Sequence, residues 1–110
     1  MDKQLLLEIN QLHAQICGGL ADPKRIAILY ALADQPLNVT ELATTLEMPQ
    51  ATVSRNLKVL RERGMVVAER QGANINYSLA DKRIIRALDL LRQVLAENLS
   101  KRSALAEAIS

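Results

Sequence analysis

The stretch TELATTLEMPQATVSRNLKVLRERG, residues 40–64, predicts two short helices joined by a tight turn. Pro49 ends the first helix and favours the start of the second, because proline fixes its own φ and restricts the residue before it. In the second helix, Val53, Leu57 and Leu60 recur at helical spacing and give one apolar stripe. The pattern indicates a helix-turn-helix whose second helix packs on a core along that stripe.

The remaining surface of this second helix carries five side chains that can donate hydrogen bonds, and none of them is acidic. Thr52, Arg55 and Lys58 lie opposite or lateral to the apolar stripe on a helical wheel, and Ser54 and Asn56 lie on its two shoulders. Phosphates and base edges offer mainly acceptors, so such a face suits DNA. An ordinary solvated basic face would have the same pattern, so the neighbouring segments must distinguish the two interpretations.

The composition favours one small helical domain. A chain of 110 residues and 12.2 kDa has a modest core, which association with a second copy would help to stabilise. Phe and Trp are absent, so the core must be built from Leu, Ile, Val and Ala, a set that favours helices. The net charge of +2 is a mild basic excess. No apolar run approaches a membrane span and no export signal is visible, so a cytoplasmic location is expected.

Residues 1–20 predict a helix with a broad apolar face. Its core positions step by four, three and four, and they are Leu5, Ile9, Leu12 and Ile16. We expect one side to pack on its own domain and the other on a second subunit, a single broad core contact being the alternative. Gly18 and Gly19 are expected to interrupt this helix, since glycine is costly inside a helix and common where one ends.

The next two helices have marked starts. Asp22 is a good N-cap with Pro23 in the first turn after it, and Asn38 or Thr40 can cap the helix that begins near residue 39. Lys24 and Arg25 also fall in the first turn, where positive charge opposes the helix dipole. A nearby phosphate is one reason for cations at these two positions.

After Gly64 the period changes from helical to alternating. Residues 65–79 contain a β-rich run, a glycine turn and a second alternating run, which predicts a β-hairpin with Ile75, Tyr77 and Leu79 facing inward. The donors expected at its tip and outer face are Arg70, Gln71, Asn74 and Asn76. Helix, turn, helix and then a hairpin is the order of a winged helix-turn-helix domain. The expected fold is therefore mainly α with a β-hairpin wing.

The last helix is expected over residues 82–99 and has a second broad apolar face, which includes Leu88, Leu91 and Leu95. The first and last helices have more apolar surface than one small domain can bury. This favours a dimer formed through these two helices. The tail that follows either extends the last helix or frays.

Three runs of the sequence together resemble the ArsR/SmtB family of small dimeric bacterial transcriptional repressors. They are LADPKRIAILYAL, LNVTELATTLEMPQATVSRNLKVLRERGMV and VAERQGANINYSL, and the resemblance covers nearly the whole chain. It implies a single domain over 1–110 that binds an inverted-repeat operator in double-stranded DNA as a homodimer, through the helix-turn-helix (39–64) and the wing (65–79). The donor pattern and this resemblance together predict the DNA contacts Thr40, Gln50, Thr52, Ser54, Arg55, Asn56, Lys58, Arg70, Gln71 and Asn74.

The regulatory positions depart from the family pattern. Members that sense arsenic or cadmium have Cys-Val-Cys where this chain has Asn38, Val39 and Thr40, so no thiolate remains. Members that sense zinc use Asp-x-His and a second pair on the last helix. The matching positions here are Asp81, Arg83, Val94 and Glu97, which removes half of the donors. We therefore expect no metal and no cofactor at either site, with Asp81 serving as a helix cap and Arg83 pairing with Glu97 or another acid.

His13 and Cys17 are the remaining candidates for a switch, because they lie one helical turn apart. Two such pairs across a dimer would make a set fit for zinc, and the thiol alone would allow redox sensing; the plainer interpretation is a buried cysteine beside a surface histidine. An enzyme is not expected, since no paired acids or glycine-rich phosphate loop accompany them. A winged-helix module that binds protein and touches DNA weakly remains the rival interpretation.

Overall fold

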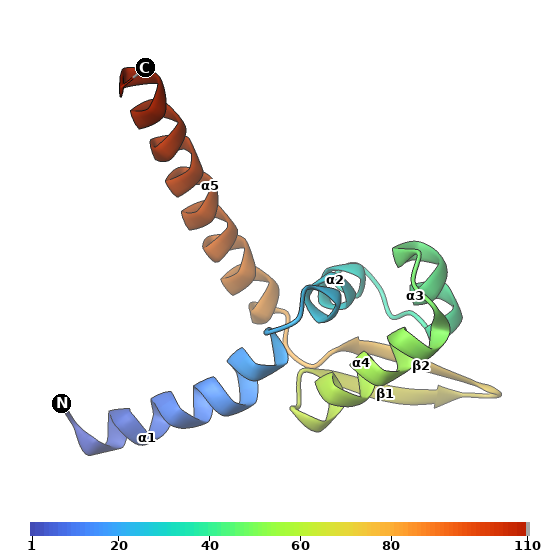
Figure 1. Ribbon diagram of the computed structural model, residues 1–110. Coiled ribbons are helices and arrows are strands. Elements are labelled where there is room, and N and C mark those ends of the chain that lie inside the picture. The colour runs from blue at the N-terminus through green and yellow to red at the C-terminus, as the bar shows by residue number, and fades with distance from the viewer. Residues whose placement is uncertain (110) are drawn as a thin grey trace.

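The computed structural model describes residues 1–109, in which helices and one β-hairpin follow each other in the predicted order. The elements are α1 (Lys3–Leu12), η1 (His13–Cys17), α2 (Pro23–Ala31), α3 (Val39–Leu46), α4 (Gln50–Glu62), β1 (Val66–Gln71), β2 (Asn74–Leu79) and α5 (Arg83–Ile109). Helices α2, α3 and α4 form a body with the hairpin, while α1 and α5 project from it on one side and diverge (Figure 1). This is the winged helix-turn-helix arrangement that the sequence predicts.

The helix starts follow from the caps that the sequence offers. The Asp22 carboxylate accepts a hydrogen bond from the Lys24 amide at 2.8 Å, and Pro23 occupies the first turn of α2. Helix α3 begins with a capping box: the Asn38 side chain accepts from the Glu41 amide, and the Glu41 carboxylate accepts from the Asn38 amide. The chain leaves α4 through Gly64, whose φ of 70° favours glycine.

The core lies between α2, α3, α4 and the base of the hairpin. Its fully covered side chains are Ile28, Leu29, Leu42, Val53, Leu57, Leu60 and Val66. The apolar stripe of α4 points into this cluster, as its spacing predicts, which leaves the opposite side of the helix in solvent. Aliphatic packing therefore holds this side of α4 against the body.

The hairpin is antiparallel, with Val66 opposite Leu79 and Gln71 opposite Asn74. Gly72 and Ala73 form its turn, and Gly72 has the positive φ (64°) that two-residue hairpin turns require. Paired hydrogen bonds between the backbones of Leu37 and Tyr77, at 3.0 and 2.8 Å, join the hairpin to the segment before α3.

Ile75 does not face inward as its alternation predicts. It lies near the hairpin tip opposite Arg70 and is 38% exposed, because the core ends nearer the base of the hairpin. Tyr77 and Leu79, which lie closer to the base, pack against the core as expected.

The first helix differs from the expectation at its end. Gly18 is helical (φ −60°), its amide donates to the His13 carbonyl five residues back, and the helix runs through Gly19. The two glycines therefore do not interrupt the helix. They permit a close approach, since a Cβ at Gly18 would lie 2.6 Å from Arg63 Nη1 and one at Gly19 would lie 2.5 Å from Met65 Sδ.

Helix α5 continues ten residues past the expected end at Leu99, to Ile109, over 27 residues in all. At 1.5 Å per residue it is about 40 Å long. No apolar stretch among the helices of residues 1–109 has the length and hydropathy needed to cross a bilayer.

Candidate nucleic-acid interface

The outer side of α4 carries most of the donors that the sequence predicts for DNA. Gln50, Ser54, Arg55 and Lys58 are exposed, and Thr52 is half-buried beside them. Arg55 Nη2 lies 3.5 Å from Thr52 Oγ1, a contact that holds the guanidinium along the helix surface. No acidic residue occurs in α4 before Glu62, so this face offers donors to an acceptor-rich partner.

Thr40 extends this donor surface onto α3. It is exposed, and its Oγ1 accepts a hydrogen bond from Gln50 Nε2 at 3.5 Å. The two helices of the helix-turn-helix thus present neighbouring polar side chains at their amino-terminal ends.

Asn56 is a correction to the predicted set. Its side chain is 8% exposed: Nδ2 donates to the Thr52 carbonyl at 2.9 Å, and Oδ1 accepts from Arg25 Nη1 at 3.2 Å. Both ends of the amide are therefore engaged inside the protein, and the buried side chain does not face DNA. A signal for this was present in the spacing, because Asn56 lies three residues after Val53 and four before Leu60, on the edge of the apolar stripe.

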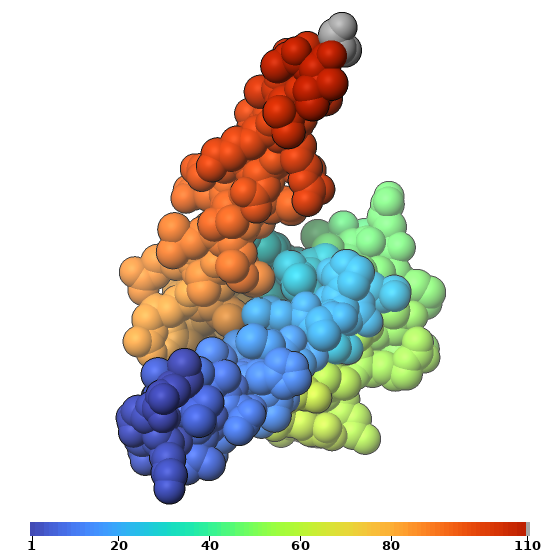
Figure 2. All heavy atoms as spheres, turned by 60° about the vertical axis from the view of Figure 1, so that its left-hand side comes forward, coloured from blue at the N-terminus to red at the C-terminus, as the bar shows by residue number. Residues whose placement is uncertain are grey.

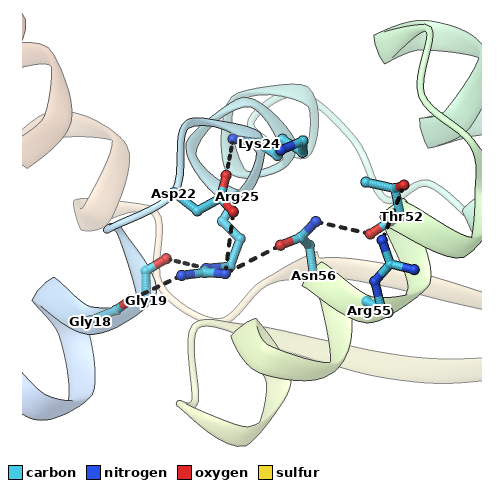
Figure 3. A network of polar contacts seen from close by, with 8 residues as sticks. All are labelled: Gly18, Gly19, Asp22, Lys24, Arg25, Thr52, Arg55 and Asn56. Carbon is cyan, nitrogen blue, oxygen red and sulfur yellow. Dashed lines mark hydrogen bonds and ion pairs between the residues drawn. The ribbon is translucent and has the colours of Figure 1, made fainter.

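Arg25 likewise faces the protein and not solvent phosphate. Its side chain is 15% exposed, and its guanidinium donates to the carbonyls of Gly19 (2.8 Å) and Gly18 (3.2 Å) as well as to Asn56 (Figure 3). A looser ion pair to Asp22, at 3.8 Å, completes its surroundings. Its neighbour Lys24 stays exposed, so only one of the two first-turn cations is available to a phosphate.

The wing presents the polar tip that the sequence predicts. Arg70, Gln71 and Asn74 are exposed at the end of the hairpin, and Asn76 Nδ2 donates across the strands to Gln71 Oε1 at 2.8 Å. That cross-strand bond orients the Gln71 amide, leaving its own NH₂ group for a partner.

At the start of α5, Asp81 and Arg83 satisfy each other. The Arg83 amide donates to Asp81 Oδ1 at 2.9 Å, as expected of a cap, and Arg83 Nη2 lies 2.7 Å from Asp81 Oδ2. These hydrogen bonds lower the pKa of Asp81 to about 2, because they stabilise the charged carboxylate. Arg83 therefore pairs with the adjacent acid and not with Glu97.

His13 and Cys17 both lie on the π-helical turn η1 and both are exposed. The interpretation of Cys17 as a buried hydrophobe is therefore wrong for the single subunit. Within residues 1–109, no cluster of three or more His, Cys, Asp or Glu side chains is arranged to hold a metal ion.

The apolar sides of α1 and α5 are uncovered. Figure 2 shows α5 standing clear of the body, and Figure 1 shows α1 extending away from it. Of the residues expected at a dimer interface, the exposed ones are Leu5 (42%), Ile9 (42%), Leu12 (52%), Leu91 (61%) and Leu95 (58%). Two others differ: Leu88 is buried in the core of its own chain, and Ile16 is half-buried against that core. Ile16 lies in η1 and Leu88 lies in the first two turns of α5, where the two helices meet the body.

A cluster between α2 and α5 was not predicted from the sequence. Tyr30 Oη donates to Asp89 Oδ1 at 2.6 Å, and the Arg92 guanidinium lies 5.3 Å above the Tyr30 ring. Burial and the hydrogen bond to Asp89 raise the pKa of Tyr30. The cluster fixes the base of α5 on the body, and its residues are too far apart in sequence for a spacing argument to join them.

Known proteins similar to this chain are bacterial regulators. Residues 22–67 match the family described as "Bacterial regulatory protein, arsR family". The HTH-type transcriptional regulator NmtR of Mycobacterium tuberculosis is 43% identical over 83 residues, which cover 73% of this chain and 69% of that protein. The transcriptional repressor SmtB homolog of Synechocystis is 38% identical over 88 residues, covering 80% of this chain and 64% of that protein.

A solved structure with the same architecture is the homodimeric winged helix-turn-helix DNA-binding domain of Mb0332 from Mycobacterium bovis, a possible ArsR-family transcriptional regulator. The two share a TM-score of 0.75 at 30% identity, and the alignment covers 90% of this chain and 91% of that one.

Proposed function

Because this chain belongs to the ArsR family of bacterial regulatory proteins, we propose that it is a homodimeric cytoplasmic repressor that binds an inverted-repeat operator. The observation that carries the proposal is the outer face of α4, where exposed Ser54, Arg55 and Lys58 offer donors with no acid beside them. Base edges in the major groove and phosphates are the acceptors that such a helix meets on DNA.

The dimer follows from the uncovered apolar sides of α1 and α5. Pairing these sides about a two-fold axis buries leucines that the single chain leaves in water. The two copies of α4 then enter successive major grooves, about 34 to 36 Å apart or a multiple of that. The tip of each wing contacts the backbone or minor groove beside its half-site through Arg70, Gln71 and Asn74.

The test compares two exposed cations of α4. Genomic fragments that the wild-type protein selects supply the operator, and the affinities of Arg55→Ala and Lys58→Ala are measured on it and on random duplex at one salt concentration. Arg55→Ala is expected to cost about 1 to 3 kcal/mol on the operator and to spare random DNA, because a base contact carries specificity. Lys58→Ala should weaken both DNAs alike, as loss of a phosphate contact does. Equal and negligible effects of both substitutions would refute DNA reading by α4.

We propose that metal ions do not regulate this protein through the family's metal-sensing positions, because the residues there are unsuited to bind them. Asn38, Val39 and Thr40 offer no thiolate, and Arg83 is engaged with Asp81. Zinc, cadmium and arsenite are therefore expected to leave the operator complex intact when titrated into it. Release of the wild type by any of them would show a site that the single subunit does not contain.

A second candidate, a thiol-responsive repressor, is favoured by one observation: the exposed Cys17 thiol on η1. In that case an oxidant or a persulfide donor releases operator from the wild type but not from Cys17→Ser, because only this side chain can form a sulfenic acid or persulfide. We expect that neither the wild type nor Cys17→Ser releases the operator on this treatment.

The rival interpretation is a module that binds protein and not DNA. Retention on heparin or random duplex DNA, and loss of that retention as salt is raised, distinguishes a DNA-binding protein from such a module.

A further inference from the structure

The recognition helix is tied to the end of the first helix by one half-buried arginine. Arg25, on α2, spans the gap between them: its Nε and Nη2 donate to the carbonyls of Gly19 and Gly18, and its Nη1 donates to Asn56 of α4. Those carbonyls belong to the carboxyl end of a helix, where acceptors lack helical partners and the dipole favours a cation. The guanidinium thus joins two helices that are far apart in sequence.

Asn56 is the residue of α4 that receives this contact, and it bonds in turn within α4. With its oxygen accepting from Arg25, its NH₂ group donates to the Thr52 carbonyl one turn back. Thr52 Oγ1 in turn accepts from Arg55, the side chain proposed to contact a base (Figure 3). Only one orientation of the Asn56 amide satisfies both partners, because its oxygen cannot donate and its nitrogen cannot accept.

A second attachment holds the far end of α4. Arg63, which follows the last residue of α4, donates through Nη1 to the carbonyls of Ala14 and Gln15 in η1, the latter at 3.4 Å. Asn56 and Arg63 are seven residues apart, about 10 Å along the helix. Two attachments at that separation fix both the position and the rotation of α4 relative to the end of α1.

We propose that Arg25 and Asn56 are positioning residues for operator recognition, which make α4 and the α1–η1 helix one rigid unit. This inference rests on the proposed function, because α1 is there a dimerisation helix. If α4 moves with α1, the separation of the two recognition helices is set by this linkage and not by the aliphatic core alone. Arg25 and Asn56 then determine which half-site spacing the dimer accepts, although neither touches DNA.

The test separates positioning from general stability by measuring discrimination. Arg25→Lys and Asn56→Ser, and the two combined, are compared with the wild type on the selected operator, on random duplex, and on operators with one base pair added or removed between the half-sites. Lysine keeps the charge but cannot donate in the three directions of the guanidinium fork. Random-DNA affinity should therefore stay within about twofold, since the net charge is unchanged.

Each single variant is expected to lower the ratio of operator to random affinity about tenfold and to bind the altered spacings as well as the original. The double variant should lose no more than the worse single one, because both changes break the same linkage. Ile28→Val is the matched control: it removes one methyl group from the aliphatic core on the same helix, α2, and should lower Tm without changing the ratio.

A folded Arg25→Lys or Asn56→Ser protein that keeps the wild-type ratio and spacing preference would overturn the inference, and so would additive losses in the double variant. Should Arg25→Lys fail to fold, Asn56→Ser alone decides, because it leaves α2 intact. Wild-type protein that selects no operator would instead refute the proposed function, so the two failures are distinguishable.

Discussion

At the scale of single residues, the entry to α3 depends on two short polar side chains. Asn38 and Glu41 exchange hydrogen bonds at 2.8 and 3.0 Å, so two amides that the helix cannot satisfy internally find partners. Helix α3 has only eight residues, too few to be stable without such help and without its packing on α4.

Replacing Asn38 with alanine should therefore cost about 1 kcal/mol of unfolding free energy, or roughly 4 to 8 °C in Tm for a domain of this size. Thermal unfolding followed by circular dichroism, at one protein concentration, measures the loss. Thr45→Ala is the matched control, since Thr45 is exposed in the same helix and alanine suits helix interiors. Equal changes in Tm for the two variants would show that the cap contributes nothing.

Individual residues also mark where sequence reasoning succeeded and failed. The caps at Asp22 and Asn38 and the stripe of α4 were predictable, because they depend on neighbours within one or two turns. The burial of Asn56 was not, because it depends on Arg25, thirty-one positions away in sequence. Arg25 itself gave a signal, a cation in a first turn, but its acceptors are carbonyls of another helix.

At the scale of elements, the wing is a short two-stranded ribbon that the body supports only at its base. Backbone hydrogen bonds between Leu37 and Tyr77 hold that base, while the turn at Gly72 extends into solvent with Arg70 and Asn74 around it. A polar tip of this kind, beside α4, has phosphates as its nearest acceptors on DNA.

Charge reversal at the wing should change the salt dependence of binding. Arg70→Glu is expected to weaken the operator complex and to flatten the slope of log affinity against log salt by about one phosphate contact per subunit. Arg102→Glu makes the same change of charge on α5, far from the wing, and serves as the control. If both variants shift the slope equally, the wing makes no local contact with the backbone.

Element boundaries were predictable where a residue dictates them and not elsewhere. The hairpin turn at Gly72 and the exit from α4 at Gly64 both need positive φ, so glycine predicts them. The sequence leaves open whether the tail after Leu99 extends the last helix, because no glycine or proline marks a stop there, and in the structure α5 continues to Ile109. Gly18 and Gly19 predicted a break where the helix continues, because these positions need glycine for the close approach of Arg63 and Met65.

At the scale of the whole molecule, the distribution of apolar surface is uneven. The body buries its aliphatic side chains, whereas α1 and α5 leave leucines such as Leu7 (62%), Leu91 (61%) and Leu95 (58%) in water. Covering one such side chain contributes about 1.5 to 3 kcal/mol, so several on each of two helices suffice to drive association.

Placing a charge on this surface should dissociate the dimer. Leu95→Asp is expected to sediment as a monomer at concentrations where the wild type is dimeric, because an unpaired carboxylate would be buried at the interface. Its operator affinity should fall steeply while random-DNA binding persists. Val67→Asp alters a comparably exposed apolar residue (50%) on the wing and should remain dimeric. A dimeric Leu95→Asp protein would show that α5 is not the contact.

The π-helical turn η1 changes the direction in which the apolar face of the first helix points. The Gly18 amide bonds five residues back, so the turn holds one residue more than α geometry allows, and one residue is about 100° of rotation. Before η1, Leu5 and Ile9 lie open to a partner; Ile16 within it and Leu20 after it pack on the body. One continuous helix thereby turns its apolar side from one neighbour to another. Gain or loss of one residue here would rotate the free end of that helix while both flanking sequences stay unaltered, a short evolutionary route to a different dimer.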